Sequence, residues 1–312
     1  MQLVKLFSGN GTKVLAEKIA HEFGKPLGSV SIDKFSDGEI SARFDESVRG
    51  SDIFIIQSTT APSDNLVELL FLIDAAKRAS ADYITIVVPY FGYARQDRKD
   101  KPRVTIAAKL LANILIAAGA ERLMTCDLHA DQIQGFFDIP VDHLDGSSLF
   151  VPYLKSLKLK NIIFASPDVG GVKRARNYAK YFQVDMVVCD KHRERANEIV
   201  SMQLIGNVAG ADVILVDDLI DTGGTICRAA KLMMDKGAKS VRAIVTHPVL
   251  SGNAYENINK SVLKELVVTD TIQLKQESKK IHVLSIAGLF AKAIRKIHDH
   301  ESISSLFIPS FN

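Results

Sequence analysis

Short runs of aliphatic and β-branched residues alternate with helix-like stretches along almost the whole sequence. Apolar runs without polar alternation predict strands that are buried on both faces of a sheet. Between these runs, apolar residues recur at the spacing of a helix, as in 66–76 and 226–234. The alternation predicts an α/β fold with mainly parallel sheets flanked by helices. The predicted strands are Ser51–Gln57, Tyr83–Val88, Arg122–Cys126, Asn161–Ser166, Asp185–Cys189, Asp212–Val216 and Val241–Thr246.

The length of 312 residues favours two domains. Asp145-Gly146 is a turn signal, and Ser147 is suited to cap the next helix, so we predict domains at 1–146 and 147–312. A four-residue echo, Ala-Asp-Tyr-Ile at 81–84 and Ala-Asp-Val-Ile at 211–214, opens one strand in each half. Two similar α/β units would account for it.

Charge, cysteine usage and the apolar segments argue against several classes of protein. Lys and Arg number 39 against 36 Asp and Glu, so the net charge of +3 gives no general case for binding nucleic acid or membrane. The cysteines at 126, 189 and 227 form no Cys-x-x-Cys pair, which argues against a disulfide framework or a zinc site and for a reducing compartment. The N-terminus lacks the features of a signal peptide, and the most apolar segment, 104–120, is too short to span a bilayer. We therefore expect a cytoplasmic protein.

The strongest motif follows the aliphatic strand Asp212–Val216 and runs from Asp217 to Thr225, Asp-Asp-Leu-Ile-Asp-Thr-Gly-Gly-Thr. In an open parallel sheet, ligands bind beyond the carboxyl ends of the strands, where this loop is expected. The Thr-Gly-Gly-Thr part offers backbone N–H groups at the start of a helix, which suits a phosphate monoester. Asp217 and Asp218 would repel a phosphate but suit the vicinal hydroxyls of a ribose. The plainer alternative is a turn whose acids cap a helix.

The Asp217–Thr225 loop resembles the phosphoribosyl-pyrophosphate loop of the phosphoribosyltransferase fold, and no Walker A pattern occurs in the chain. Over essentially its whole length, the sequence resembles the class I ribose-phosphate pyrophosphokinases. The matching strings are Phe35–Glu39, Tyr93–Lys99, Asp127–Ala130, Ser166–Gly171, Asp190-Lys191 with Arg193, and Ser302–Phe307. The resemblance implies two tandem phosphoribosyltransferase-like domains. The first would carry the ATP-contacting loops and take part in assembly, and the second the ribose 5-phosphate loop and the catalytic loop.

The resemblance implies transfer of the β,γ-diphosphoryl group of ATP to the anomeric hydroxyl of ribose 5-phosphate, with release of AMP. It implies that two segments bind the nucleotide. It also implies that the Asp217–Thr225 loop binds ribose 5-phosphate, together with Arg193. The nucleotide residues are Phe35, Asp37, Gly38, Glu39, Arg95, Gln96 and Asp97. The ribose 5-phosphate residues are Asp217, Asp218, Asp221, Thr222, Gly223, Gly224 and Thr225. Standing alone, residues 35–39 would be read as a hairpin turn.

The same resemblance supplies the metal and the catalytic cations. Mg²⁺ would bridge the phosphates and be held by His129 and Asp168, of which the carboxylate is the more usual magnesium ligand. Lys191 and Arg193, on a basic loop after a strand, would carry the main catalytic role. Lys173, Arg174 and Arg176 fit either a solvated helix face or the steering of phosphate.

Family members usually form hexamers, so the resemblance implies a homo-oligomer, and regulated members respond to phosphate and ADP. The segment Arg103–Ala107 departs from the usual family pattern in a region that contributes to this regulation, which puts the effectors in doubt here. Two other functions share the ribose loop. One is a phosphoribosyltransferase that consumes phosphoribosyl pyrophosphate, and the other is a non-catalytic regulatory relative.

Overall fold

The computed structural model describes residues 3–192 and 201–308, apart from the side chains of 191, 192 and 201. The chain divides into two compact units. Unit 1 holds residues up to Asp145, with Thr271–Gln273 and Ile286–Leu306; unit 2 holds Gly146–Asp270, with Leu274–Ser285 and the C-terminal end.

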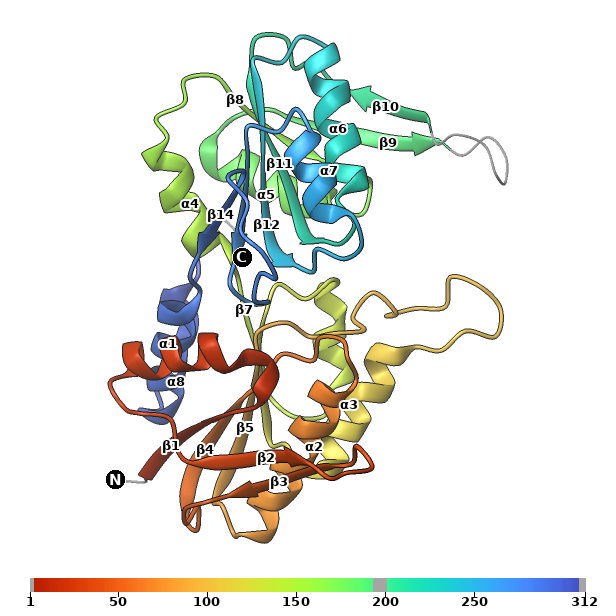
Figure 1. Cartoon of the computed structure of the whole chain (residues 1–312). Coiled ribbons are helices and arrows are strands. Elements are labelled where there is room, and N and C mark those ends of the chain that lie inside the picture. Colours follow the sequence, from red (N-terminus) through yellow and green to blue (C-terminus); the bar gives the residue numbers. More distant parts are fainter. Residues whose placement is uncertain (1–2, 193–200, 309–312) are drawn as a thin grey trace. The chain divides into compact units, whose positions relative to one another are not determined.

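Unit 1 is built on a five-stranded sheet in the order β1-β4-β5-β6-β7, in which every neighbouring pair is parallel. Helices cover both faces, α1 and α8 on one side and α2 and α3 on the other (Figure 1). Gly24 ends α1 because it adopts a left-handed conformation, with φ of 83°. The strands are β1 (Leu3–Ser8), β4 (Ser51–Ile56), β5 (Tyr83–Val88), β6 (Arg122–Cys126) and β7 (Val141–Leu144); the helices are α1 (Lys13–Phe23), α2 (Asp64–Arg78), α3 (Ala107–Ala118) and α8 (Ala287–His298).

The C-terminal helix α8 belongs to unit 1, whereas the sequence placed the whole of 147–312 in the second domain. Its apolar face is buried and packs against α1. The Arg295 guanidinium lies over the Phe23 ring, 4.9 Å from the centroid, and donates to the Phe23 carbonyl at 2.6 Å. The prediction failed because the apolar stripe of α8 shows that the helix is buried but not against which sheet.

Unit 2 is built on a seven-stranded sheet in the order β10-β9-β8-β11-β12-β13-β14, and only the β9–β10 pair is antiparallel. One apolar core lies under α6 and α7, and another under α4 and α5. The strands are β8 (Ile162–Ser166), β9 (Met186–His192), β10 (Ser201–Ile205), β11 (Asp212–Ile220), β12 (Ser240–Pro248), β13 (Glu265–Thr269) and β14 (Ile281–Leu284); the helices are α4 (Ser147–Ser156), α5 (Val172–Phe182), α6 (Gly224–Asp235) and α7 (Ala254–Lys260).

The α/β prediction is confirmed, and all seven predicted strands are present. Three of them extend further than expected, and one of these is β12, which was predicted as Val241–Thr246 and runs from Ser240 to Pro248. β9 continues through Lys191 and His192, which the sequence placed in a basic loop, because β10 pairs with it along this stretch. β11 continues to Ile220 because β12 pairs with it as far as Pro248.

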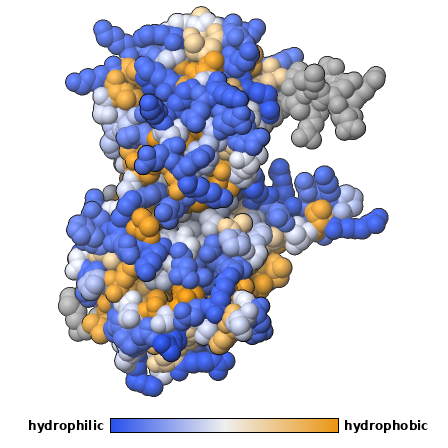
Figure 2. Space-filling view, in the orientation of Figure 1, coloured by the Kyte–Doolittle hydropathy of each residue, from blue (hydrophilic) through white to orange (hydrophobic). Residues whose placement is uncertain are grey.

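Hydrophobic side chains are concentrated in these cores. On the face shown in Figure 2, hydrophilic residues predominate, and hydrophobic residues form small separate patches. Within the described ranges, no helix combines the length and the apolar character needed to cross a bilayer.

Candidate active site

The central strand β11 of unit 2 carries the two adjacent carboxylates. The sequence placed Asp217 and Asp218 in a loop, but both lie within the strand, near its carboxyl end. Asp218 is buried and Asp217 is partly buried. The rest of the predicted loop, Asp221 to Gly223, connects β11 to α6, which begins at Gly224. The structure therefore brings acids and glycines together at the carboxyl end of one buried strand.

The carbonyl groups of this connection are all hydrogen-bonded. The Asp221 carbonyl accepts from the Ser251 backbone N–H at 3.1 Å, and the Thr222 carbonyl accepts from the Asn257 side-chain Nδ2 at 2.9 Å. The Gly223 carbonyl accepts from the Cys227 N–H at 3.0 Å as part of the first turn of α6. The Ser251 hydroxyl also donates to the Asp221 carboxylate.

The N–H groups of the same peptide units lie on the opposite side. In a trans peptide the C=O and N–H point in opposite directions, so the N–H groups of Thr222, Gly223 and Gly224 point away from their bound carbonyls. No acceptor for these three N–H groups is found among the described residues. Three successive unpaired N–H groups at a helix N-terminus form a concave seat for an anion.

Gly223 is required by the shape of this turn. Its φ of 74° lies in the left-handed region, which a side chain makes unfavourable. A Cβ there would lie 3.5 Å from Ile258 Cγ1, so the residue is also packed against α7.

The loop after β8 lies beside the carboxyl end of β11, because the two strands are neighbours in the sheet. Gly171 N–H donates to the Asp168 carboxylate at 3.2 Å, and the Ser166 hydroxyl donates to the Asp168 carbonyl at 2.5 Å. A Cβ on Gly171 would lie 4.0 Å from Asp217 Oδ1, which shows how close the two loops are. Asp168, the predicted metal ligand of unit 2, thus belongs to the same cluster as Asp217 and Asp218.

The crowding of carboxylates changes the acidity of Asp217. Burial raises the pKa of Asp217 well above its usual value, and the charges of Asp218 and Asp168 raise it further. The Arg174 guanidinium acts in the opposite direction. Arg174 is partly buried, and its charge acts on this carboxylate cluster.

Asp217→Asn should change how stability depends on pH. Because the folded state raises the Asp217 pKa, this group favours folding below the ordinary value of 3.8, and its contribution is lost as pH rises toward the folded pKa. An asparagine side chain does not titrate. In buffer with EDTA, we expect the difference in melting temperature to shift in favour of the Asp217→Asn variant as the pH is raised from about 4 to 7. A pH-independent difference would contradict the assigned acidity.

In unit 1, residues 35–39 form the turn of the β2 (Val30–Lys34) and β3 (Ile40–Phe44) hairpin. Gly38 has φ of 95°, and the Phe35 N–H donates to the Glu39 carbonyl at 2.8 Å. The Asp37 carboxylate accepts from the Glu39 N–H at 3.0 Å. The Phe35 ring is 59% exposed, so an aromatic face is presented on a tight, fixed turn.

Side-chain contacts join this hairpin to the other predicted nucleotide segment. Lys34 pairs with Asp64 at the start of α2, and the neighbouring Ser63 hydroxyl lies 3.0 Å from the Tyr93 hydroxyl. Tyr93 opens the turn that carries Arg95, Gln96 and Asp97, in which the Arg95 and Gln96 side chains are exposed.

A further contact joins this turn to the segment that follows His129, the predicted magnesium ligand of unit 1. Gln132 Nε2 donates to the Asp97 carboxylate at 3.1 Å, three residues after the exposed His129. The turn with Arg95, Gln96 and Asp97 and the segment with His129 follow the carboxyl ends of the neighbouring strands β5 and β6, and the base of the hairpin is joined to α2 through Lys34.

The two predicted catalytic residues, Lys191 and Arg193, lie at the boundary of the residues that the structure describes. The Lys191 backbone is in β9, where it is paired with Met202 of β10. Arg193 lies outside the described residues. Sequence reasoning missed Ser251 and Asn257, which hold the loop after β11. Neither residue belongs to a motif with an expected spacing from the loop.

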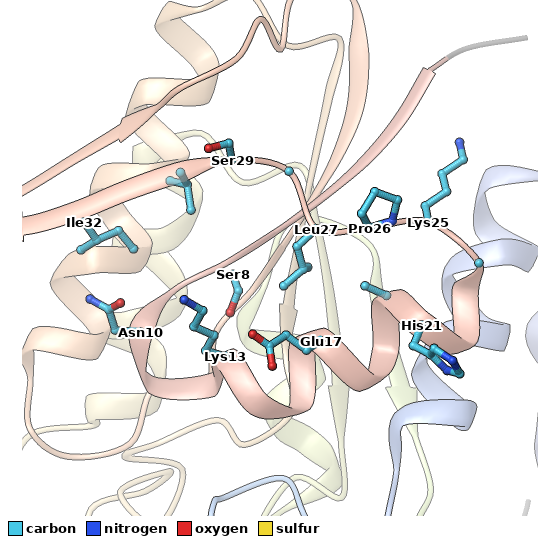
Figure 3. A pocket seen from close by; sticks show the side chains of 14 residues that line it. Ser8, Asn10, Lys13, Glu17, His21, Lys25, Pro26, Leu27, Ser29 and Ile32 are labelled. Atoms are coloured by element: carbon cyan, nitrogen blue, oxygen red, sulfur yellow. The ribbon is translucent and has the colours of Figure 1, made fainter.

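A separate groove of about 700 Å³ lies in unit 1 between α1 and the segment 24–32 (Figure 3). Lys13, Glu17 and His21 line it from the helix, and Leu27 and Val30 line the other wall. None of the predicted site residues contributes to it. Its mixed charges and largely exposed lining select no class of ligand.

Two family models match the sequence. Residues 4–119 match the N-terminal domain of ribose phosphate pyrophosphokinase, and residues 189–308 match the phosphoribosyl synthetase-associated domain. The ribose-phosphate pyrophosphokinase of Porphyromonas gingivalis is 55% identical over 303 residues, which cover 97% of both chains. That of Campylobacter jejuni is 56% identical over 309 residues, covering 99% of this chain and all of the relative.

A solved structure agrees with these matches. The crystal structure of phosphoribosylpyrophosphate synthetase from Mycobacterium smegmatis has a TM-score of 0.91 and 40% identity, and the match covers 96% of this chain and 100% of that chain. The fold and the loop after β11 define an α/β protein in which three successive N–H groups, without an acceptor among the described residues, follow a central strand. The chain belongs to the ribose-phosphate pyrophosphokinase family and is an enzyme.

Proposed function

We propose that the protein transfers the β,γ-diphosphoryl group of ATP to the anomeric hydroxyl of D-ribose 5-phosphate, giving 5-phospho-α-D-ribose 1-diphosphate and AMP for nucleotide biosynthesis. The observation that carries the proposal is the row of three unpaired N–H groups at residues 222–224, which directly follows a strand bearing two carboxylates. An anion seat and a hydroxyl-binding pair on the same strand-to-helix connection suit a phosphorylated sugar better than either feature alone.

Ribose 5-phosphate would place its phosphate on the N–H groups of Thr222, Gly223 and Gly224, with the Thr222 and Thr225 hydroxyls as further donors. Its vicinal hydroxyls would donate to the carboxylates of Asp217 and Asp218. Because the Ser251 hydroxyl donates to the Asp221 carboxylate, that group has a fixed direction. The sugar would then be held at both ends, which limits the orientations of its anomeric hydroxyl.

ATP would be bound by unit 1. The exposed Phe35 ring offers a face for the adenine, and the carboxylates of Asp37 and Glu39 can accept from its amino group. The Arg95 guanidinium suits the phosphates, with Gln96 and Asp97 beside it. The contacts through Asp64, Ser63 and Gln132 support this assignment, because they link the base of the hairpin to α2, α2 to Tyr93, and Asp97 to the segment after His129.

Mg²⁺ would be held by His129 and Asp168, with waters and phosphate oxygens as its other ligands. The carboxylate crowding that raises the pKa of Asp217 fits a cation beside Asp168. When bound, Mg²⁺ would neutralise charge on the phosphates.

Lys191 and Arg193 would supply positive charge to the transferred group as negative charge develops on its oxygens, and Arg193 would also contact ribose 5-phosphate.

We further propose that the enzyme works in the cytoplasm as a homo-oligomer, a hexamer by family resemblance. Phosphate and ADP would be its candidate effectors, although Arg103–Ala107 departs from the family pattern.

Two alternatives predict different products. A phosphoribosyltransferase would consume phosphoribosyl pyrophosphate and need no ATP, and a regulatory relative would turn over neither substrate. Incubating the protein with Mg²⁺, ATP and ribose 5-phosphate and identifying the released nucleotide separates the three. We expect AMP in step with phosphoribosyl pyrophosphate. ADP, or no turnover, would exclude the proposal.

A further inference from the structure

We propose that Asn257, on α7, is a positioning residue for ribose 5-phosphate binding. Its side-chain amide fixes the Thr222–Gly223 peptide so that the Gly223 N–H faces the phosphate. This inference rests on the proposed function of the loop and adds a residue outside the motif, 32 positions beyond its end at Thr225.

The Thr222–Gly223 peptide needs an external contact to set its direction. Gly223 and Gly224 follow each other, and glycine adopts left- and right-handed conformations about equally well. The peptide before them can therefore rotate at low cost. A rotated peptide would turn the Thr222 carbonyl oxygen toward the phosphate, where it would repel the anion instead of leaving an N–H to bind it.

Asn257 supplies that contact. Its Nδ2 donates to the Thr222 carbonyl at 2.9 Å, which holds the oxygen on the α7 side and the Gly223 N–H on the other. The preceding peptide is held by Ser251, three residues before α7, whose N–H donates to the Asp221 carbonyl. Residues 251–257 thus hold two successive peptides of the loop.

The side chain of Asn257 contributes little to the packing of α7. The residue is exposed, and α7 is anchored by the buried residues Ala254, Tyr255 and Ile258. Among the described residues, the Thr222 carbonyl is the partner of the Asn257 amide. An exposed asparagine with one bond to a ligand-binding loop is better explained by a role in the loop than by a role in folding.

Three substitutions test the proposal through the separate kinetic constants. Asn257→Ala removes the donor and should raise KM for ribose 5-phosphate about two- to tenfold, the range expected for one lost hydrogen bond, with KM for ATP unchanged. Asn257→Asp keeps the shape but sets a carboxylate against the carbonyl, so the rise should be larger, at least about tenfold. Asn257→Gln keeps the amide and should restore part of the loss.

Asn259→Ala is the matched control. Asn259 is also exposed on α7, and its Oδ1 accepts from the Ser278 hydroxyl at 2.7 Å, away from the loop. Asn259→Ala should leave KM for ribose 5-phosphate and KM for ATP unchanged. The melting temperatures of all four variants should be similar.

The inference is overturned if Asn257→Asp binds ribose 5-phosphate as well as the unchanged protein does. It is also overturned if KM for both substrates rises together with a loss of thermal stability, since that marks a purely structural role. Either result leaves the proposed function intact when the unchanged protein forms AMP and phosphoribosyl pyrophosphate. Failure of that reaction itself would instead refute the proposed function.

Discussion

Replacing Lys191 with alanine is expected to lower kcat by roughly a hundredfold to a thousandfold, with KM for ATP and for ribose 5-phosphate little changed. Negative charge develops on the oxygens of the diphosphoryl group in the transition state. A positive charge beside that group therefore stabilises the transition state more than it stabilises the bound substrates. Steady-state kinetics with each substrate varied in turn would measure the two constants separately.

The control for this prediction is Lys180→Ala, which removes an exposed lysine of α5 in the same unit. It changes the net charge equally and should leave kcat unaltered. A rise in KM with kcat preserved in Lys191→Ala would assign Lys191 to ground-state binding and contradict its catalytic role.

Replacing Gly223 with alanine should raise KM for ribose 5-phosphate by roughly tenfold to a hundredfold, which corresponds to weakened hydrogen bonds to a charged group. A side chain at φ of 74° is strained, and relieving that strain rotates the peptides on either side. The N–H groups of Gly223 and Gly224 would then no longer converge on the phosphate. KM for ATP should change little, because the proposed nucleotide residues belong to unit 1.

Gly210→Ala is a matched control for the backbone strain of a side chain at positive φ. Gly210 has φ of 69° in the same unit, and a Cβ there would meet nothing within 4 Å. Gly210→Ala should therefore lose a similar amount of stability while keeping the KM for ribose 5-phosphate. Equal kinetic effects from the two substitutions would mean that Gly223 acts through general stability and not through the loop.

The interior of the fold was predictable from sequence, and its edges were not. Strands such as Tyr83–Val88 and Arg122–Cys126 have the predicted bounds because continuous apolar runs occur where a strand is buried on both faces. β10 and β14 are edge strands with exposed residues, so they lack that pattern. The attachment of α8 to unit 1 depends on contacts with α1, such as that of Arg295 with Phe23, which are 272 positions apart in sequence.

The candidate site likewise has one part that was predictable from the sequence and one part that was not. The string from Asp217 to Thr225 is local, so its combination of acids, glycines and a following helix could be recognised without a structure. Asn257 and Ser251 act on that string from a different segment, and a single asparagine or serine carries no signal of its own. The acidity of Asp217 likewise depends on Asp168, which only the pairing of β8 with β11 brings near.

The most direct test of the central claim follows the terminal phosphates of ATP. With ATP labelled in the γ-phosphate, Mg²⁺ and ribose 5-phosphate, the account predicts that all consumed label appears in phosphoribosyl pyrophosphate. One unlabelled AMP should form for each labelled product, because the β- and γ-phosphates move as one group. Label recovered as inorganic phosphate, or in a sugar phosphate formed together with ADP, would contradict it.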